Sequence, residues 1–529
     1  MSFRLARSAG LISIATMGSR LLGVAREVVL ARLFGASAGP AMDAYNVAFR
    51  VPNLVRDLFA EGAMTAAFVP TFTRTLTTRG RDAAWRLGNL VINALLVVTT
   101  ILVVAAIIFA EPITRAIASG DEFASVPGKL ELTTRLTQIM MPFLTTIAVA
   151  VAMMGMLNSL HRFFLPALSP AMFNLVTIVS AFTIVPLMPS VGLPPIAGIA
   201  IATVLGGIGQ IAVQWPSLRK EGFRYRPALD FRDPDVREIL RLMGPGTLGL
   251  AAVQINVFVN TALATTQPEG AVSWLQFAFR LMYLPIGLFG VSIATAALPD
   301  LSKQAADTDK SAMRATISSA LRMMLMLNVP ATIGLIALAH PIVELVLEYG
   351  KFGPADSVAT AAALMFYAPG LVGYSAVKIA SPSFYALGDS RTPVVISVAS
   401  VAVNLALNLL LVRTMGYRGL ALGTAIAALF NAVVLLTLLS RRLDGLDGRR
   451  VLGAFLKVTA ASALMGTAAY AAAGWLAVVV PGGGWYARMA RVFTAIAAGV
   501  VVLLISARLL RITELRDAMN RIANRAVRR

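Results

Sequence analysis

Long apolar stretches alternate with short polar segments along the whole chain. Each stretch is about 20 residues long, the length that an α-helix needs to cross the hydrocarbon core of a bilayer. About fourteen such stretches can be counted, and they cover residues 10–34, 43–73, 87–110, 133–157, 166–187, 194–216, 240–264, 272–299, 315–339, 358–385, 393–412, 418–439, 452–475 and 488–508. The pattern predicts an all-α polytopic membrane protein with about 14 transmembrane helices.

The composition agrees with this prediction and excludes several other classes. Of the 529 residues, 57% are hydrophobic and 14% are charged, whereas a soluble domain carries about 25% charged residues. The chain has no cysteine and no Walker A motif, and its two histidines, His161 and His340, lie far apart. We therefore expect no disulfide, no thiolate or histidine metal site, no nucleotide hydrolysis and no cofactor.

The Lys and Arg content of the loops alternates along the chain between basic loops and loops with few or no basic residues. Loops 35–42, 188–193 and 265–271 hold no Lys or Arg, whereas the segment 217–239 and the tail 511–529 are strongly basic. This alternation is typical of the positive-inside rule and predicts that both termini are cytoplasmic. It also accounts for the net charge of +20, so we expect no nucleic-acid partner.

An internal repeat divides the chain. Ala-Phe-Arg at residues 48–50 recurs at 278–280, an offset of 230, and Pro142 aligns with Pro369 at an offset of 227. Two six-helix halves that face the same way are typical of secondary transporters whose substrate site lies between the halves. The predicted divisions are a six-helix lobe at 1–216, a cytoplasmic interfacial loop at 217–239, a second lobe at 240–440, two further transmembrane helices at 441–510 and a basic tail at 511–529.

Charged residues inside the apolar stretches are the candidate functional residues, because a charge at the bilayer centre is costly. The first two stretches contain Arg20, Arg26, Glu27, Arg32, Asp43, Arg50, Arg56, Asp57 and Glu61, and the eighth contains Arg280. One interpretation is structural, with arginines and carboxylates clamping neighbouring helices together. The other is a cavity lined by guanidinium groups, which suits a phosphate-bearing substrate because guanidinium binds phosphate bidentately.

Several segments resemble one family closely. They are SRLLGVARE at 19–27, DAYNVAFRVPNLVRDLFAEGAMTAAFVP at 43–70, SWLQFAFRLMYLPIGLFGVSIATAALPDLS at 273–302 and YGKFGPADS at 349–357. They are similar to the MurJ (MviN) family of lipid II flippases, in the multidrug/oligosaccharidyl-lipid/polysaccharide exporter superfamily.

The resemblance implies a set of site residues. Family arginines that line a cationic cavity match Arg20, Arg26, Arg56 and Arg280, which would bind the substrate's diphosphate. Arg50 and Asn53 would support that cavity; Glu27, Asp43 and Glu61 would gate it or tie helices together; and the last two helices would form a groove for the prenyl tail.

The sequence also departs from the family. Glu27 stands where Asp is frequent, and Asp57 stands where some members have a second Arg. Some members are thought to bind sodium through a carboxylate in the seventh span, but the seventh and eleventh spans here offer only asparagines: Asn256, Asn260, Asn404 and Asn408. We therefore expect no metal site.

The resulting hypothesis is a lipid II flippase of the bacterial inner membrane, working by alternating access in cell-wall synthesis. It would be a transporter and not an enzyme, and a monomer whose partners are lipid II, the bilayer and the cell-wall synthesis machinery. One alternative is a flippase for another prenyl-diphosphate glycan, such as an O-antigen unit. Others are a drug or organic-cation antiporter, which would need carboxylates in the cavity, and a non-transporting scaffold.

Overall fold

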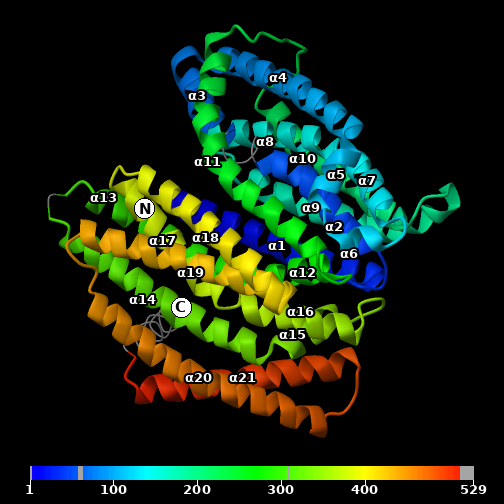
Figure 1. Ribbon diagram of the computed structural model, residues 1–529. Helices are drawn as coiled ribbons and strands as arrows, with labels where there is room; N and C mark the ends of the chain where they lie inside the picture. The colour runs from blue at the N-terminus through cyan, green and yellow to red at the C-terminus, as the bar shows by residue number, and fades with distance from the viewer. Residues whose placement is uncertain (1–2, 58–63, 308, 513–529) are drawn as a thin grey trace. The chain divides into compact units, whose positions relative to one another are not determined.

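The computed structural model describes residues 3–57, 64–307 and 309–512, and within these ranges it contains helices joined by short loops and no β-strand (Figure 1). Contacts divide the chain into two compact units. The first unit holds Met1–Ser273 together with Tyr349–Phe352, and the second holds Trp274–Glu348 and Gly353–Arg529. The predicted all-α fold is confirmed.

The helices of the first unit are α1 (Phe3–Phe34), α2 (Ala41–Arg56), α3 (Met64–Arg79), α4 (Arg81–Ile108), α5 (Ala110–Ile117), α6 (Asp121–Ser125), α7 (Lys129–Met140), α8 (Phe143–Ser159), α9 (Phe164–Thr183), the 3₁₀ turns η2 (Val185–Leu187) and η3 (Pro189–Val191), α10 (Ile196–Lys220) and α11 (Pro234–Thr265). α12 (Ala271–Pro285) begins in the first unit and continues into the second. The second unit then contains the π-helical turn η4 (Ile286–Gly290), α13 (Val291–Gln304), α14 (Ser311–Ala337), α15 (Ala339–Leu347), α16 (Pro354–Tyr367), α17 (Gly370–Ala386), α18 (Arg391–Met415), α19 (Tyr417–Arg442), α20 (Gly448–Val479) and α21 (Trp485–Leu509). Because α11 belongs to the first unit, the contact boundary falls later than the predicted lobe boundary, and the division into lobes at 216 and 240 stays a prediction.

Each predicted apolar stretch lies on one helix or on consecutive helices separated by a break, as far as the structure describes it. Nine helices in the described ranges are long and apolar enough to cross a membrane, and the bent pair α16 and α17 would make a tenth. The chain is therefore an integral membrane protein by these criteria. The second and eighth stretches are divided into shorter helices, and the number fourteen stays a prediction.

Prolines mark several of the breaks. Pro142 is the N-cap of α8, directly after α7, and Pro369 is the N-cap of α17, directly after α16. A proline has no N–H to donate and is tolerated at the start of a helix, so each one ends one helix and begins the next. These are the two prolines that the internal repeat aligns. The α16–α17 break bends the chain by 43°.

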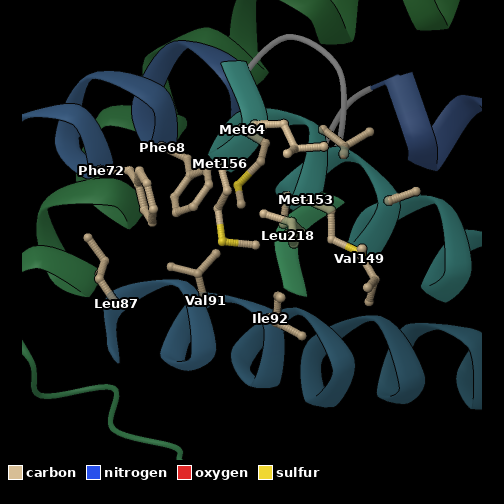
Figure 2. Close-up of a cluster of buried hydrophobic side chains, with 14 of the residues drawn as sticks. Met64, Phe68, Phe72, Leu87, Val91, Ile92, Val149, Met153, Met156 and Leu218 are labelled. Atoms are coloured by element: carbon tan, nitrogen blue, oxygen red, sulfur yellow. The ribbon is translucent and has the colours of Figure 1, made fainter. Parts of the chain in front are cut away.

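The first unit has an aromatic and methionine core between α3, α4, α8 and α10 (Figure 2). Phe68 and Phe72 of α3 lie beside Met156 of α8, and Met153 of α8 and Leu218 of α10 belong to the same cluster. All five side chains are buried. This packing holds α3 in place immediately after the site-bearing helix α2.

The connection between α10 and α11 is attached to α4 by side-chain amides. Asn89 donates to the Arg224 carbonyl at 3.0 Å and accepts from the Arg226 N–H at 2.9 Å, as a neighbouring β-strand would. Asn93 donates to the Arg226 carbonyl at 2.9 Å and accepts from the Tyr225 hydroxyl at 2.6 Å. Residues 221–233 contain no helix, so this connection is a loop bound to α4. The two ends of the predicted segment 217–239 lie in α10 and α11, and its position at the membrane interface stays a prediction.

Ion pairs anchor the ends of this connection. Arg74 of α3 pairs with Glu238 of α11, and Arg79 pairs with Asp235 at 2.7 Å. The hydrogen bond from Arg74 lowers the pKa of Glu238 below its ordinary value. These two ion pairs keep α3 and α11 together at their polar ends.

In the second unit α20 and α21 form a hairpin that packs on α14 and α15. Arg488 of α21 pairs with Glu344 at 3.2 Å and with Glu348 at 2.8 Å, and it donates to the Glu348 carbonyl at 2.8 Å. A cation at the C-terminus of α15 satisfies carbonyl groups that the helix leaves unpaired. The hairpin matches predicted spans thirteen and fourteen; its role as a groove for a prenyl tail stays a prediction.

Candidate functional site

Arg26 and Glu27 form a buried ion pair on α1. The Nη2 of Arg26 lies 2.6 Å from the Oε1 of Glu27, and the two side chains are 6% and 8% exposed. The guanidinium also lies over the ring of Phe173 on α9, 5.3 Å from its centroid. A desolvated cation over an aromatic face is attracted to the ring, so this arginine joins α1 to α9 in the conformation described.

The same face of α1 approaches α9 closely at Gly23. A Cβ at Gly23 would lie 3.5 Å from the Nδ2 of Asn174, and that amide donates to the Ser19 carbonyl at 3.2 Å. Arg20, one turn before Gly23, is half-buried on α1. Arg20, Arg26 and Glu27 therefore all lie on the single helix α1, and their role in a substrate site stays a prediction.

Arg56 and Asp57 form a second pair of adjacent residues, at the C-terminal end of α2. The Nε and Nη2 of Arg56 donate to the Oδ1 of Asp57 at 3.0 and 2.7 Å. The side chains are 25% and 32% exposed, several times more than those of the α1 pair. The Oδ2 of Asp57 accepts from Gln254 of α11 at 3.3 Å, so this pair is anchored from a second helix but stays accessible.

The supporting residues of α2 lie in the turns before this pair. Arg50 is half-buried and makes interactions of its own. Asn53 is half-buried as well, and its Oδ1 is a buried atom without a hydrogen-bond partner among the described residues. A buried acceptor without a donor is costly. It marks α2 as a place where a polar ligand or water would be stabilised.

Arg280 is the predicted site residue of the second unit. It lies on α12 with an exposed side chain, five residues before Pro285 and the π-helical turn η4. π-helical turns inside helices are frequent at functional sites. The turn is tightly packed, because a Cβ at Gly290 would lie 2.7 Å from the Oγ of Ser375.

Asp43 is the centre of a buried polar network. Its Oδ1 accepts from the N–H of Ser273 at 3.0 Å and from the Ser273 hydroxyl at 2.6 Å, while its Oδ2 accepts from the N–H of Gly270 at 2.8 Å. Lys129 of α7, 1% exposed, donates to the same Oδ2 at 3.2 Å. Asn46 donates to the Ser273 hydroxyl at 3.0 Å, so α2, α7 and the start of α12 are tied together here. This arrangement supports the interpretation of Asp43 as a residue that ties helices together.

Sequence reasoning missed two partners. Lys129 lies in a polar segment between apolar stretches, where nothing in the sequence marks it as the buried counter-ion of Asp43. Gln254, the second partner of Asp57, lies in an apolar stretch and carries no charge that would single it out. Glu61, the third predicted acidic residue, lies outside the described residues.

The asparagines of the eleventh span are used in helix packing. Asn408 donates to Asn404 at 3.2 Å, and Asn404 donates to Thr424 of α19 at 3.4 Å. A Cβ at Gly423 would lie 2.0 Å from the Oδ1 of Asn408, so a glycine is needed for this close contact. No group of three or more His, Asp or Glu side chains that could hold a metal ion occurs in the described part of the chain.

Comparison with solved structures identifies the class of fold. An inward-facing multidrug resistance MATE family transporter of the MOP superfamily matches with a TM-score of 0.67 at 17% identity, over 83% of this chain and 99% of that chain. Identity this low shows the fold alone. The chain therefore has the fold of the MOP superfamily transporters.

The family follows from closer relatives. The model of the protein family described as "Lipid II flippase MurJ" matches residues 30–506 of this chain. A probable lipid II flippase MurJ of Bdellovibrio bacteriovorus is 35% identical over 460 residues, covering 87% of this chain and 86% of the relative. The lipid II flippase MurJ of Burkholderia cenocepacia is 35% identical over 431 residues, covering 81% of this chain and 82% of the relative. A structure of lipid II flippase MurJ in an inward closed conformation matches with a TM-score of 0.78 at 27% identity, over 96% of this chain and 99% of that chain. The chain belongs to the MurJ family.

Proposed function

We propose that this chain is a lipid II flippase that carries the undecaprenyl-diphosphate-linked peptidoglycan precursor from the cytoplasmic to the periplasmic leaflet by alternating access. Membership of the MurJ family over most of the chain carries this proposal. The apolar helices and the charged residues of α1, α2 and α12 support it, because a transporter of an anionic lipid headgroup needs cations within its membrane-spanning part.

The proposed diphosphate-binding residues are Arg20, Arg26, Arg56 and Arg280. Arg280 is an exposed residue and the Arg56 side chain is 25% exposed, which favours their direct contact with an anion. Arg26 is buried against Glu27 and Phe173, so its contact with a diphosphate requires that this ion pair opens during the transport cycle. Arg50 and Asn53 would support the sugar-diphosphate end.

The remaining parts of the proposal concern location and partners. The protein would lie in the bacterial inner membrane with both termini in the cytoplasm, in agreement with the positive-inside pattern. It would act as a monomeric transporter without covalent chemistry, and it would work beside the enzymes of cell-wall synthesis. The membrane potential is a candidate driving force, since moving one charge across it is worth about 2.3 kcal/mol per 100 mV.

The experiment that tests this function measures lipid II on the outer face of the inner membrane with a degrading enzyme that does not cross it. Cells depleted of the protein are rescued with wild type, with Arg280→Ala, or with Arg413→Ala as a control at an exposed arginine of α18. We expect depletion to protect lipid II, wild type and Arg413→Ala to restore cleavage, and Arg280→Ala to fail at normal protein levels.

The opposite result would redirect the search. If lipid II stays accessible after depletion in a strain without a second flippase, the protein transports something else. Other prenyl-diphosphate glycans of the O-antigen type would then be the next substrates to test. Normal rescue by Arg280→Ala would remove this arginine from the site and would favour a structural role for it.

A further inference from the structure

Asp57 determines which N–H donors of the Arg56 guanidinium group remain available to an anion. A guanidinium group has five N–H donors in a fixed plane. The carboxylate of Asp57 takes the donors of one edge, from Nε at 3.0 Å and from Nη2 at 2.7 Å, with a single oxygen. The other edge, formed by Nη1 and the second hydrogen of Nη2, makes no hydrogen bond within the described ranges of the chain.

The carboxylate itself is held from a second helix. Gln254 of α11 is buried and donates to the other oxygen of Asp57 at 3.3 Å. Asp57 is therefore fixed between α11 and Arg56. The guanidinium is fixed in turn through two hydrogen bonds, which leaves its Nη1–Nη2 edge as the one that a phosphate group would bind.

Asp57 directly follows the last residue of α2 and has right-handed helical backbone angles. The pair is partly exposed, with side chains 25% and 32% exposed, and accessible ion pairs add less stability than buried ones lose when one partner is removed. The Asp57 carboxylate therefore mainly affects the local positive charge that a ligand meets at Arg56.

We propose that Asp57 is a positioning residue that orients Arg56 toward the diphosphate of the substrate and limits how tightly the site retains it. This inference rests on the proposed function. The carboxylate nearly neutralises Arg56, and its negative charge repels an approaching diphosphate. A transporter has to release its substrate as well as bind it, so a site that is only moderately attractive supports turnover. The substrate class in question is a prenyl diphosphate with an attached sugar.

Two probes separate orientation from charge. The purified protein in lipid nanodiscs is titrated with farnesyl diphosphate, and the flipping of fluorescent lipid II is followed in vesicles. Asp57→Asn keeps an oxygen for Arg56 but removes the negative charge. We expect it to bind farnesyl diphosphate roughly three- to tenfold more tightly, as expected when a like charge is removed from a partly exposed site, and to flip lipid II more slowly. Asp57→Glu should behave nearly as wild type.

One control variant and two contrary results complete this experiment. Glu131→Gln, at an exposed residue of α7, should bind and transport as wild type does, and thermal stability checks that each variant is folded. Unchanged or weaker binding by Asp57→Asn overturns the inference, and so does faster flipping by that variant.

A further variant separates this inference from the proposed function. Arg56→Gln should bind farnesyl diphosphate more weakly than wild type. If it does so while Asp57→Asn binds as wild type, only the inference fails. If wild type binds the diphosphate but moves no lipid II, the proposed function fails, and tighter binding by Asp57→Asn still supports the role of Asp57 at the anion site.

Discussion

Two ion pairs of the first unit are each formed by adjacent residues, an arginine followed directly by an acidic residue, but their surroundings differ strongly. Arg26 and Glu27 lie in the middle of packed helices with side chains 6% and 8% exposed. Arg56 and Asp57 lie at the end of α2 with side chains 25% and 32% exposed. The comparison shows that the dipeptide alone does not define a role. Because the first pair is buried, removing one partner leaves an uncompensated buried charge, whereas the second pair is accessible enough to interact with a ligand.

The largest effect is expected where the buried pair is broken. Glu27→Ala leaves the guanidinium of Arg26 buried without its counter-ion, and removing one partner of a buried pair costs about 3–5 kcal/mol. The apparent melting temperature of the purified protein should fall sharply, and less protein should accumulate in the membrane. Wild-type stability in Glu27→Ala would mean that Arg26 can turn to another partner or to water, and the contrast between the two pairs would then be lost.

A smaller effect is expected at Lys129. Lys129→Met removes the counter-ion of Asp43, but the carboxylate keeps the N–H groups of Gly270 and Ser273 and the Ser273 hydroxyl. The loss should be near the value of one charged hydrogen bond, about 1.5–3 kcal/mol. Thermal unfolding in detergent measures it. A loss as large as that of Glu27→Ala would show that the three remaining donors do not compensate for the missing cation.

The accessible pair should contribute little to stability. Asp57→Asn is expected to change the free energy of unfolding by no more than about 1 kcal/mol, while it changes anion binding as described above. Thermal unfolding and ligand titration on the same preparation test this separation. A large destabilisation without any change in binding would place Asp57 with Glu27, as a structural partner.

The smallest effect is expected at the surface of α7. Glu131 and Arg135 form a pair of the i,i+4 type at 2.7 Å, with side chains 67% and 63% exposed. Glu131→Gln should alter stability by less than about 0.5 kcal/mol, and added salt should remove even that difference. This variant supplies the lower end of the scale on which the other three are placed.

Much of the fold could be predicted from the sequence because its signals are local. The length of each apolar stretch gives a helix, and a proline such as Pro142 or Pro369 shows where a helix is broken. The motifs around Arg20, Arg56 and Arg280 were enough to indicate the family. These features depend on residues that lie within one or two helical turns of each other.

The partners of the charged residues could not be predicted in the same way. Asp43 and Lys129 are 86 residues apart in the sequence, and Asp57 and Gln254 are 197 apart. No periodic pattern connects such positions. The difference between the pairs at Arg26 and Arg56 is likewise a matter of burial, which depends on the neighbouring helices and not on the two residues themselves.

The attachment of the α10–α11 connection to α4 has a consequence for the order of assembly. The amide of Asn89 pairs with the backbone of Arg226, which is synthesised 137 residues later. When α4 first enters the bilayer, its two asparagines have neither the extended chain nor Tyr225 to bond with. The polar side of α4 is completed only after α10 has followed it into the membrane. Until then the only described partner of these amides that is present is the Asn89 carbonyl, to which Asn93 donates within α4 at 2.8 Å, so the remaining amide groups at the start of α4 depend on water until the later segment arrives.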